Sequence, residues 1–227
     1  MKGSCSSDFL LTVATSLDSR LVKNISPLSP RRRALLGQSL EYLCQISVCE
    51  PHCMGGDHVI ESLAGRCFNL SMGSVRLISD YLYDESLNLT RSIAEITNLA
   101  FLFNESPLLL EKWKTAKRPD RLREFSPASV RKSLDQLGVP SPVTEASYRE
   151  LCEKATHVTP DTRANQHDKT DERLGYVGGH FQLGGHMESL DTLLLYCALS
   201  AVVLSNIVGR PQNVEVLAEL GSNTFDA

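Results

Sequence analysis

Apolar residues recur at steps of three and four along most of the chain, with polar residues between them. In the first segment the recurring positions are Phe9, Val13, Leu17, Leu21 and Ile25. This spacing places apolar side chains on one face of an α-helix, whereas a half-buried strand alternates at every second residue. Because no segment shows clear strand alternation, the pattern predicts an all-α fold.

Residues that commonly stand at helix ends divide this pattern into further helices. Serine, threonine and aspartate side chains accept hydrogen bonds from the first N–H groups of a helix, and proline is tolerated in its first turn. Gly138 is a natural stop, because glycine readily adopts the positive φ that ends many helices. After the last long helix, residues 188–208, at most a short turn is expected. The expected helix starts are Arg31, Asp57, Asp84, Ser106, Ser126, Thr144 and Glu188.

Residues 158–185 break the helical pattern and are expected to form a long irregular loop. Loops of this length in a compact domain are commonly functional or disordered. His180 follows two glycines, which let backbone donors approach a ligand, so it is a candidate ligand-binding residue. No lysine followed by serine or threonine completes a phosphate-binding loop there, and a flexible loop is the alternative.

The 227 residues, 42% of them hydrophobic, suffice for one substantial core. We expect N-terminal helices in residues 1–49 that pack on a helical core formed by residues 50–227. Lys and Arg total 23 and Asp and Glu 27, and the resulting net charge of −4 disfavours a protein whose main task is to wrap nucleic acid. A basic cluster around Trp113 could still contact RNA.

Cysteine content and apolar stretches bear on the compartment. The seven cysteines could suggest disulfide bonds, but Asp8 and Asp18 stand where a signal peptide would be apolar. The chain is therefore expected to be cytoplasmic, with reduced thiols. The longest apolar stretch, residues 193–209, is short for a membrane span and is interrupted by serine and asparagine, so a buried core helix and no membrane contact are expected.

Cysteine and histidine residues near position 50 could bind zinc through thiolate and imidazole groups. They are Cys44, Cys49, His52, Cys53 and His58. Their spacing is irregular and contains no Cys-x-x-Cys pair, so no metal ion and no cofactor are predicted.

A polar stripe runs along the predicted fourth helix. Asn88, Arg91, Glu95 and Asn98 lie at successive steps of three or four residues and so share one face. Arg91 and Glu95 could form an ordinary exposed ion pair. Alternatively, Arg91 could bind a phosphate or carboxylate while Glu95 orients it, or the pair could lie buried between two helices.

A second polar group extends from Tyr148 to His157. His157 follows a predicted helix, where an imidazolium could simply cap the last carbonyl groups. As an acid or base it would need a partner, and Glu95, Tyr148 and Arg149 are the candidates. The predicted catalytic residues are His157, Glu95 and Arg91, and the predicted ligand-binding residues are Asn88, Tyr148, Arg149 and His180.

Three runs of the sequence together resemble an uncharacterised bacterial family. They are Ala64-Gly65-Arg66, the stretch from Tyr83 to Glu95, and Tyr148-x-x-Leu151-Cys152-x4-His157. That family, a domain of unknown function, is similar to the HEPN group, the higher-eukaryote and prokaryote nucleotide-binding helical domains. The resemblance covers roughly residues 50–209, and it implies an up-and-down bundle of about seven helices and a homodimer.

HEPN-type ribonucleases carry an arginine and a histidine a few residues apart, which act on RNA across a dimer interface. Seven residues separate Arg149 from His157, more than in that motif, and glycines interrupt the stretch between Arg173 and His180. The resemblance implies interaction with a nucleotide or RNA, with a ribonuclease-like role in stress or phage defence. The competing hypothesis is a non-enzymatic module that binds a protein partner and whose polar stripe is structural.

Overall fold

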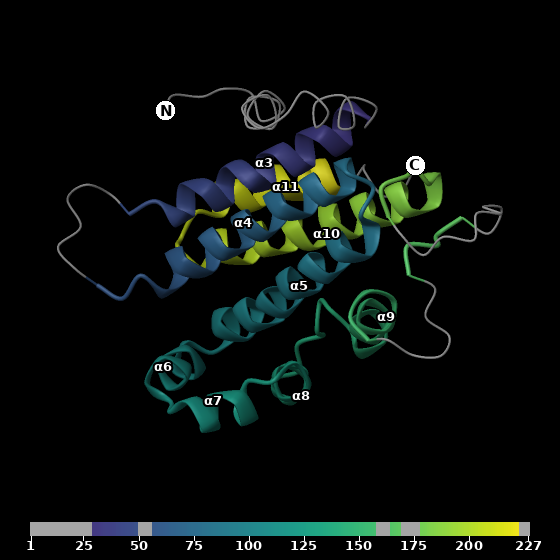
Figure 1. The fold of residues 1–227 in the computed structure, drawn as a ribbon. Helices are drawn as coiled ribbons and strands as arrows, with labels where there is room; N and C mark the ends of the chain where they lie inside the picture. The colour runs from purple at the N-terminus through teal and green to yellow at the C-terminus, as the bar shows by residue number, and fades with distance from the viewer. Residues whose placement is uncertain (1–28, 50–55, 158–163, 169–177, 223–227) are drawn as a thin grey trace.

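The computed structural model describes residues 29–49, 56–157, 164–168 and 178–222, and these ranges contain nine helices and no strand. The predicted all-α fold is therefore confirmed, with more helices than the seven or so expected. The predicted first helix, residues 9–25, lies outside the described ranges. The helices in Figure 1 are α3 (Pro30–Ser47), α4 (Val59–Ser79), α5 (Tyr83–Glu105), α6 (Pro107–Thr115), α7 (Arg118–Glu124), α8 (Pro127–Gln136), α9 (Glu145–Ala155), α10 (Leu183–Ile207) and α11 (Pro211–Ser222).

Local sequence signals explain several helix ends. The Ser126 side chain accepts a hydrogen bond from the backbone N–H of Ser129 (3.3 Å), and that of Thr144 accepts one from Ser147 (3.1 Å). Proline occupies the first turn of both α6 and α8, where its missing N–H costs no helical hydrogen bond. Gly138 has a φ of 73°, as predicted for the residue that ends α8.

Helices α7 and α11 exceed what the sequence pattern predicts. The pattern allows only a short turn after Gly209, whereas α11 extends over 12 residues. In α11 the side chains of Asn213 and Leu217, one turn apart, are buried against the bundle. Tertiary packing of this kind stabilises helices that are too short to be stable alone, and a local pattern does not reveal it.

Helix α10 runs through the middle of the bundle and packs against α3, α4, α5 and α11 (Figure 1). Leu193, Cys197, Ala201 and Leu204 on this helix are fully buried. By length and composition alone, this 25-residue helix could cross a membrane, because the mean hydropathy of its most apolar stretch is 1.7. More than half of its apolar stretch (56%) is buried inside the bundle, so α10 forms the core of this fold.

Small hydroxyl side chains lie where α4, α5 and α10 meet. Ser74 on α4 is hydrogen-bonded to Ser86 (2.7 Å) and Thr90 (3.2 Å) on α5. Thr97 on α5 is likewise bonded to Ser200 on α10 (2.7 Å). Because a hydroxyl both donates and accepts, these buried groups satisfy one another's hydrogen bonds.

Helices α6 to α9 lie on the outer side of α5, away from α3 and α11 (Figure 1). A second, smaller apolar cluster formed by Leu102, Val130 and Leu134 joins α8 to α5. Helix α9 packs on α5 nearer to the start of α5. The outer layer therefore places α9 beside the polar stripe of α5.

Candidate functional site

The polar stripe of α5 is the surface on which α9 and the residues before it pack. At one end of this α5–α9 contact, Asn88 Oδ1 accepts a hydrogen bond from Thr156 Oγ1 (3.2 Å). At the other end, the Asn98 amide accepts from the backbone N–H of Val143 (2.9 Å) and donates to its carbonyl oxygen (2.8 Å). The stripe and residues 143–156 thus run antiparallel.

Arg91, Glu95 and Tyr148 form a closed triangle at the centre of the α5–α9 contact. Arg91 Nη1 donates to Glu95 Oε1 (2.6 Å) and to the Tyr148 hydroxyl (2.9 Å), and that hydroxyl donates to the same carboxylate oxygen (2.6 Å). The side chains of Arg91 and Glu95 are 21% and 34% exposed. The triangle therefore ties α5 to α9. A link between two helices was one of the three roles considered for Arg91 and Glu95.

Burial raises the pKa of Tyr148, and the hydrogen bond to Glu95 and the charge of Glu95 raise it further. The phenol consequently stays protonated and keeps donating to the carboxylate. The guanidinium groups of Arg131 and Arg91 lie 5.1 Å and 5.9 Å from the centre of the Tyr148 ring, within the range of cation–π attraction. The Tyr148 hydroxyl therefore acts in the triangle as a hydrogen-bond donor and not as a base.

His157 does not lie with the other two predicted catalytic residues. It follows the end of α9, next to Thr156, which is bonded to Asn88, and it is exposed. Tyr148, which meets Glu95, lies near the start of α9. An α-helix rises about 1.5 Å per residue, so Tyr148 lies roughly 10 Å from the end of α9, after which His157 follows. The structure therefore brings Arg91, Glu95 and Tyr148 together and places His157 more than a full helical turn away from them.

The two remaining ligand-binding candidates lie apart from each other. Arg149 is exposed on α9 and pairs with Glu145 one turn earlier (2.9 Å). His180 lies just before α10, where its Nε2 is 3.0 Å from the side-chain nitrogen of Gln182. Neither residue is hydrogen-bonded to the triangle, so the ligand-binding candidates do not form one pocket in the described ranges.

A second polar cluster, which the sequence analysis missed, surrounds His167. The imidazole Nε2 lies 2.9 Å from Asp84 of α5, and Nδ1 lies 3.2 Å from Glu188 of α10. The His167 side chain is only 8% exposed. We call His167, Asp84 and Glu188 the His167 cluster. Its only sequence signal was the polar, glycine-rich composition of residues 158–185, within which His167 lies.

The His167 cluster favours the charged imidazolium. Burial, the largest single influence, lowers the pKa of His167, but the hydrogen bonds and charges of Asp84 and Glu188 together raise it to about 9. The hydrogen bond from His167 lowers the pKa of Glu188 to about 2, against an opposing effect of burial and with help from Lys154. Because both ring nitrogens are held by carboxylates, His167 is positioned to bind segments together and not to accept a proton.

Side chains also hold the backbone of residues 164–168. Asp84 accepts a hydrogen bond from the N–H of Asn165 (2.7 Å), and Gln182 accepts from those of His167 and Asp168 (2.7 Å and 3.1 Å). Asp84 was predicted to cap the fourth helix, and this is wrong because Leu82 stands at the cap and Asp84 serves this distant contact instead.

The start of α10 differs from the prediction for a similar reason. The Asp168 carboxylate accepts hydrogen bonds from the N–H groups of Leu183 (2.9 Å) and Gly184 (2.7 Å). This cap satisfies the first donors of α10, which begins at Leu183 and not at Glu188. The loop predicted for residues 158–185 is therefore helical in its last three positions.

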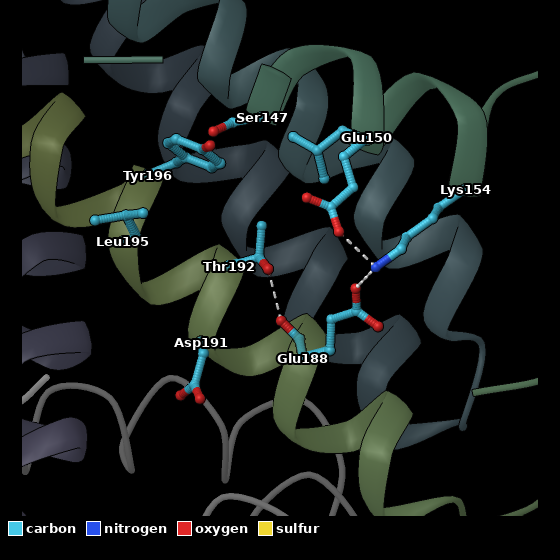
Figure 2. A pocket seen from close by; sticks show the side chains of 9 residues that line it. Ser147, Glu150, Lys154, Glu188, Asp191, Thr192, Leu195 and Tyr196 are labelled. Atoms are coloured by element: carbon cyan, nitrogen blue, oxygen red, sulfur yellow. Dashed lines mark hydrogen bonds and ion pairs between the residues drawn. The ribbon is translucent and has the colours of Figure 1, made fainter. Parts of the chain in front are cut away.

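A groove with a volume of about 300 Å³ lies between α9 and α10 (Figure 2). Lys154 of α9 forms ion pairs with Glu150 one turn earlier (2.8 Å) and with Glu188 of α10. Glu188 thus belongs both to the groove and to the His167 cluster. The groove is lined by Ser147, Glu150, Leu151, Lys154, Glu188, Asp191, Thr192, Leu195 and Tyr196.

Three of the six basic residues around Trp113 are paired with carboxylates. Lys114 contacts Asp57 and Glu111, Lys112 contacts Glu124, and Arg123 contacts Asp120. Arg121 lies 5.8 Å from the Trp113 ring centre. Pairing of this kind reduces the positive field that RNA phosphates would meet.

Metal binding has little support in the part of the chain that the structure describes. There, no three histidine, cysteine or acidic side chains gather in a way that could hold an ion. His52 and Cys53 of the weighed zinc set lie outside the described ranges. Burial raises the pKa of Cys67 and Cys197 in the core to about 12, so these thiols stay protonated.

The fold and its contacts define an all-α bundle with two interhelical polar clusters and an acidic groove on its surface. Comparison of the chain with protein-family models, with curated proteins and with solved structures finds no match. Membership of a HEPN-like family therefore stays a prediction from the sequence resemblance.

Proposed function

We propose that this protein is a non-enzymatic interaction module that binds a protein partner. One observation carries the proposal: all four residues of the polar stripe are engaged with residues 143–156. These contacts join Asn88 to Thr156, Arg91 and Glu95 to Tyr148, and Asn98 to Val143. A stripe used in this way stabilises the packing of helices and leaves little of its hydrogen-bonding capacity for a substrate.

The protonation states support the same function. A general acid or base works best when its pKa lies near the operating pH. The pKa of Tyr148 is raised well above that range, and His167 is held as a cation by two carboxylates. We assign the partner to the face of α9 and α10, where the groove lies.

Cleavage assays test this proposal. The wild-type chain is incubated with total cellular RNA and with purified tRNA, beside His157→Ala and Tyr148→Phe, and all three proteins are checked for helical content by circular dichroism. We expect no cleavage by any of them and a lower melting temperature for Tyr148→Phe. Cleavage by the wild type that is lost in a folded His157→Ala would show an enzyme and refute the module.

A second candidate function, binding of a nucleotide or RNA, is favoured by one specific observation. Arg91 Nε and Arg131 Nη1, from the two guanidinium groups beside Tyr148, are buried nitrogens with no hydrogen-bond partner. Guanidinium N–H groups bind phosphate well. A labelled single-stranded RNA that loses affinity for Arg131→Gln, while Arg149→Gln binds as the wild type does, would support this function.

The homodimer and the role in stress or phage defence rest on the sequence resemblance, and the cytoplasmic location rests on the composition of the chain; all three stay predictions. Sedimentation velocity of the full chain tests the dimer directly. A single species with the mass of one 25.0 kDa chain would contradict it.

A further inference from the structure

We propose that residues 117–122, which begin just before α7 and form most of that helix, dock an acidic segment of a protein. Helices α6 and α7 follow the end of α5 (Figure 1). The groove between α9 and α10 lies toward the start of α5, because Glu188 of the groove and Asp84 of α5 share His167. The acidic segment is therefore a second ligand, and its docking goes beyond the proposed function and does not depend on it.

This part of the molecule differs in charge from the rest of the chain. Residues 107–132 contain eight Lys and Arg against three Asp and Glu, within a chain whose net charge is −4. Of the six basic residues around Trp113, Lys117, Arg118 and Arg121 form no ion pair with the residues that the structure describes. An acidic ligand would therefore meet three neighbouring cations that are not already bound to a carboxylate.

Contacts with α5 and α6 hold this surface in place. The Arg121 guanidinium lies 5.8 Å from the centre of the Trp113 ring, whose own centre lies 5.4 Å from that of the buried Phe103 of α5. An ion pair between Lys112 and Glu124 also joins α6 to α7. Stacking uses the face of a guanidinium and leaves its N–H edge able to bind a carboxylate. The surface is thus formed before a ligand arrives, which lowers the entropic cost of binding.

The exposed face of α7 adds an apolar contact to these charges. Arg118 and Leu122 lie one helical turn apart, so their side chains are neighbours, and Leu122 is 62% exposed. No residue of α7 is buried, so this helix gains little from the packing of the bundle. A protein segment that carries an apolar side chain beside a carboxylate can cover Leu122 while it pairs with Arg118.

A protein segment fits this surface better than RNA or an anionic membrane does. RNA phosphates would leave Leu122 uncovered, and the Trp113 ring, which already contacts Arg121, is not free to stack on a base. A membrane needs a wide apolar face, whereas α7 exposes a single leucine. Asp120 and Glu124 of the same helix also reduce the positive charge that an anionic bilayer would meet.

The test is a titration of the full chain with three short peptides. Calorimetry measures the affinity, and the fluorescence of Trp113, the single tryptophan of the chain, reports binding beside α7. The peptides are acetyl-Asp-Glu-Leu-Asp-Glu-Leu-amide, a neutral form with asparagine and glutamine in place of the acids, and an acidic form with serine in place of leucine. We expect the acidic leucine peptide to bind and to change the fluorescence, the neutral form to bind about tenfold more weakly, and the serine form about threefold more weakly. No binding, binding without a change in fluorescence, or equal affinity of the neutral form would overturn the proposal.

Two variants and a matched control sharpen the test, each checked for helical content by circular dichroism. Arg118→Gln should weaken binding of the acidic leucine peptide about fivefold. Arg76→Gln makes the same change in charge on an exposed residue of α4 and should leave binding unchanged. Leu122→Ser should weaken binding of the leucine peptide about threefold and leave that of the serine form unchanged. Equal losses in the two arginine variants, or equal losses of both peptides in Leu122→Ser, would refute this mode of docking.

Two further ligands test the other occupants of this surface. They are a single-stranded oligouridylate and vesicles of phosphatidylserine and phosphatidylcholine. Tighter binding of either one than of the acidic leucine peptide would overturn the proposal. Cleavage of RNA that depends on His157 would refute the interaction module and leave this docking untouched, whereas failure of the peptide to bind would refute only the docking.

Discussion

Two polar clusters join distant parts of the chain to α5, and they differ in charge and burial. The Arg91 triangle joins α9 through the neutral phenol of Tyr148 at a partly exposed ion pair. The His167 cluster joins residues 164–168 and α10 through an imidazolium that is 8% exposed and lies between two carboxylates. From this difference we expect that the stripe, which is visible in the sequence, matters less for stability than the contact built by a single loop residue.

The physical difference lies in what remains when the central side chain is removed. Without the Tyr148 hydroxyl, Arg91 and Glu95 still pair with each other and with water. Without the His167 ring, Asp84, whose side chain is only 14% exposed, loses its cation, and Lys154 can compensate only Glu188, which is 33% exposed. Buried charges without a partner are costly, and exposed ones are not.

The largest expected effect is that of His167→Ala. Removing the imidazolium should lower the free energy of unfolding by about 3 kcal/mol, because two carboxylates lose their shared cation. Urea denaturation of the wild type and the variant measures the difference. The control is His180→Ala, which alters a half-buried histidine bonded to Gln182. It should lower the free energy of unfolding by less than about 1 kcal/mol. Equal losses in both variants would contradict the distinction between the clusters.

The next effect is a dependence of stability on pH. The pKa of His167 is about 9 in the folded chain and 6.5 ordinarily, so its stabilising effect is complete below pH 6.5 and is lost as the pH rises through 9. Between pH 7 and pH 10 the loss should be about 2 kcal/mol. Denaturation at both pH values measures it. His167→Gln should lack this component, and an equal loss in that variant would assign the dependence to other groups.

A smaller effect is expected for Asp168→Ala, which removes the cap of α10. The N–H groups of Leu183 and Gly184 would lose their acceptor, at a cost of about 1 kcal/mol. Urea denaturation should show this loss, and hydrogen exchange should show faster exchange of these two amides. If these two amides exchange as slowly in the variant as in the wild type, the cap does not stabilise the start of α10.

The smallest effect is expected for Tyr148→Phe. Loss of one hydroxyl at a partly exposed ion pair should cost about 0.5 kcal/mol. Thermal denaturation measures the change, with Arg149→Ala as the control, because its pair with Glu145 is exposed and should contribute close to nothing. A loss for Tyr148→Phe as large as that for His167→Ala would reverse the comparison of the two clusters.

The sequence predicts those features of the fold that depend on neighbouring residues. Ser126, Thr144 and Gly138 act within one helical turn, so their capping roles could be inferred from local chemistry. The spacing of Arg91 and Glu95 likewise predicts that they meet. Glu95 and Tyr148 were each predicted as partners of His157, and their hydrogen bond to each other was not foreseen.

The features that escaped prediction depend on residues far apart in the chain. Asp84 has the position of a helix cap, but its carboxylate contacts residues 164–168, some eighty positions later. Asp168 caps α10 from outside that helix, which no periodic pattern can indicate. His167 stood among several histidines of a polar segment, and only its two carboxylate partners distinguish it from them.

The close packing around Gly185 also gives a way to recognise related proteins. A Cβ atom at this position would lie 2.5 Å from the Tyr83 ring and 2.9 Å from that of His167, so any larger residue would push the rings apart. A chain that builds the same cluster should therefore combine a Tyr-Asp pair, a distant histidine, and a glycine three positions before a glutamate. Such a combination of residues can identify related proteins whose overall sequence similarity is low.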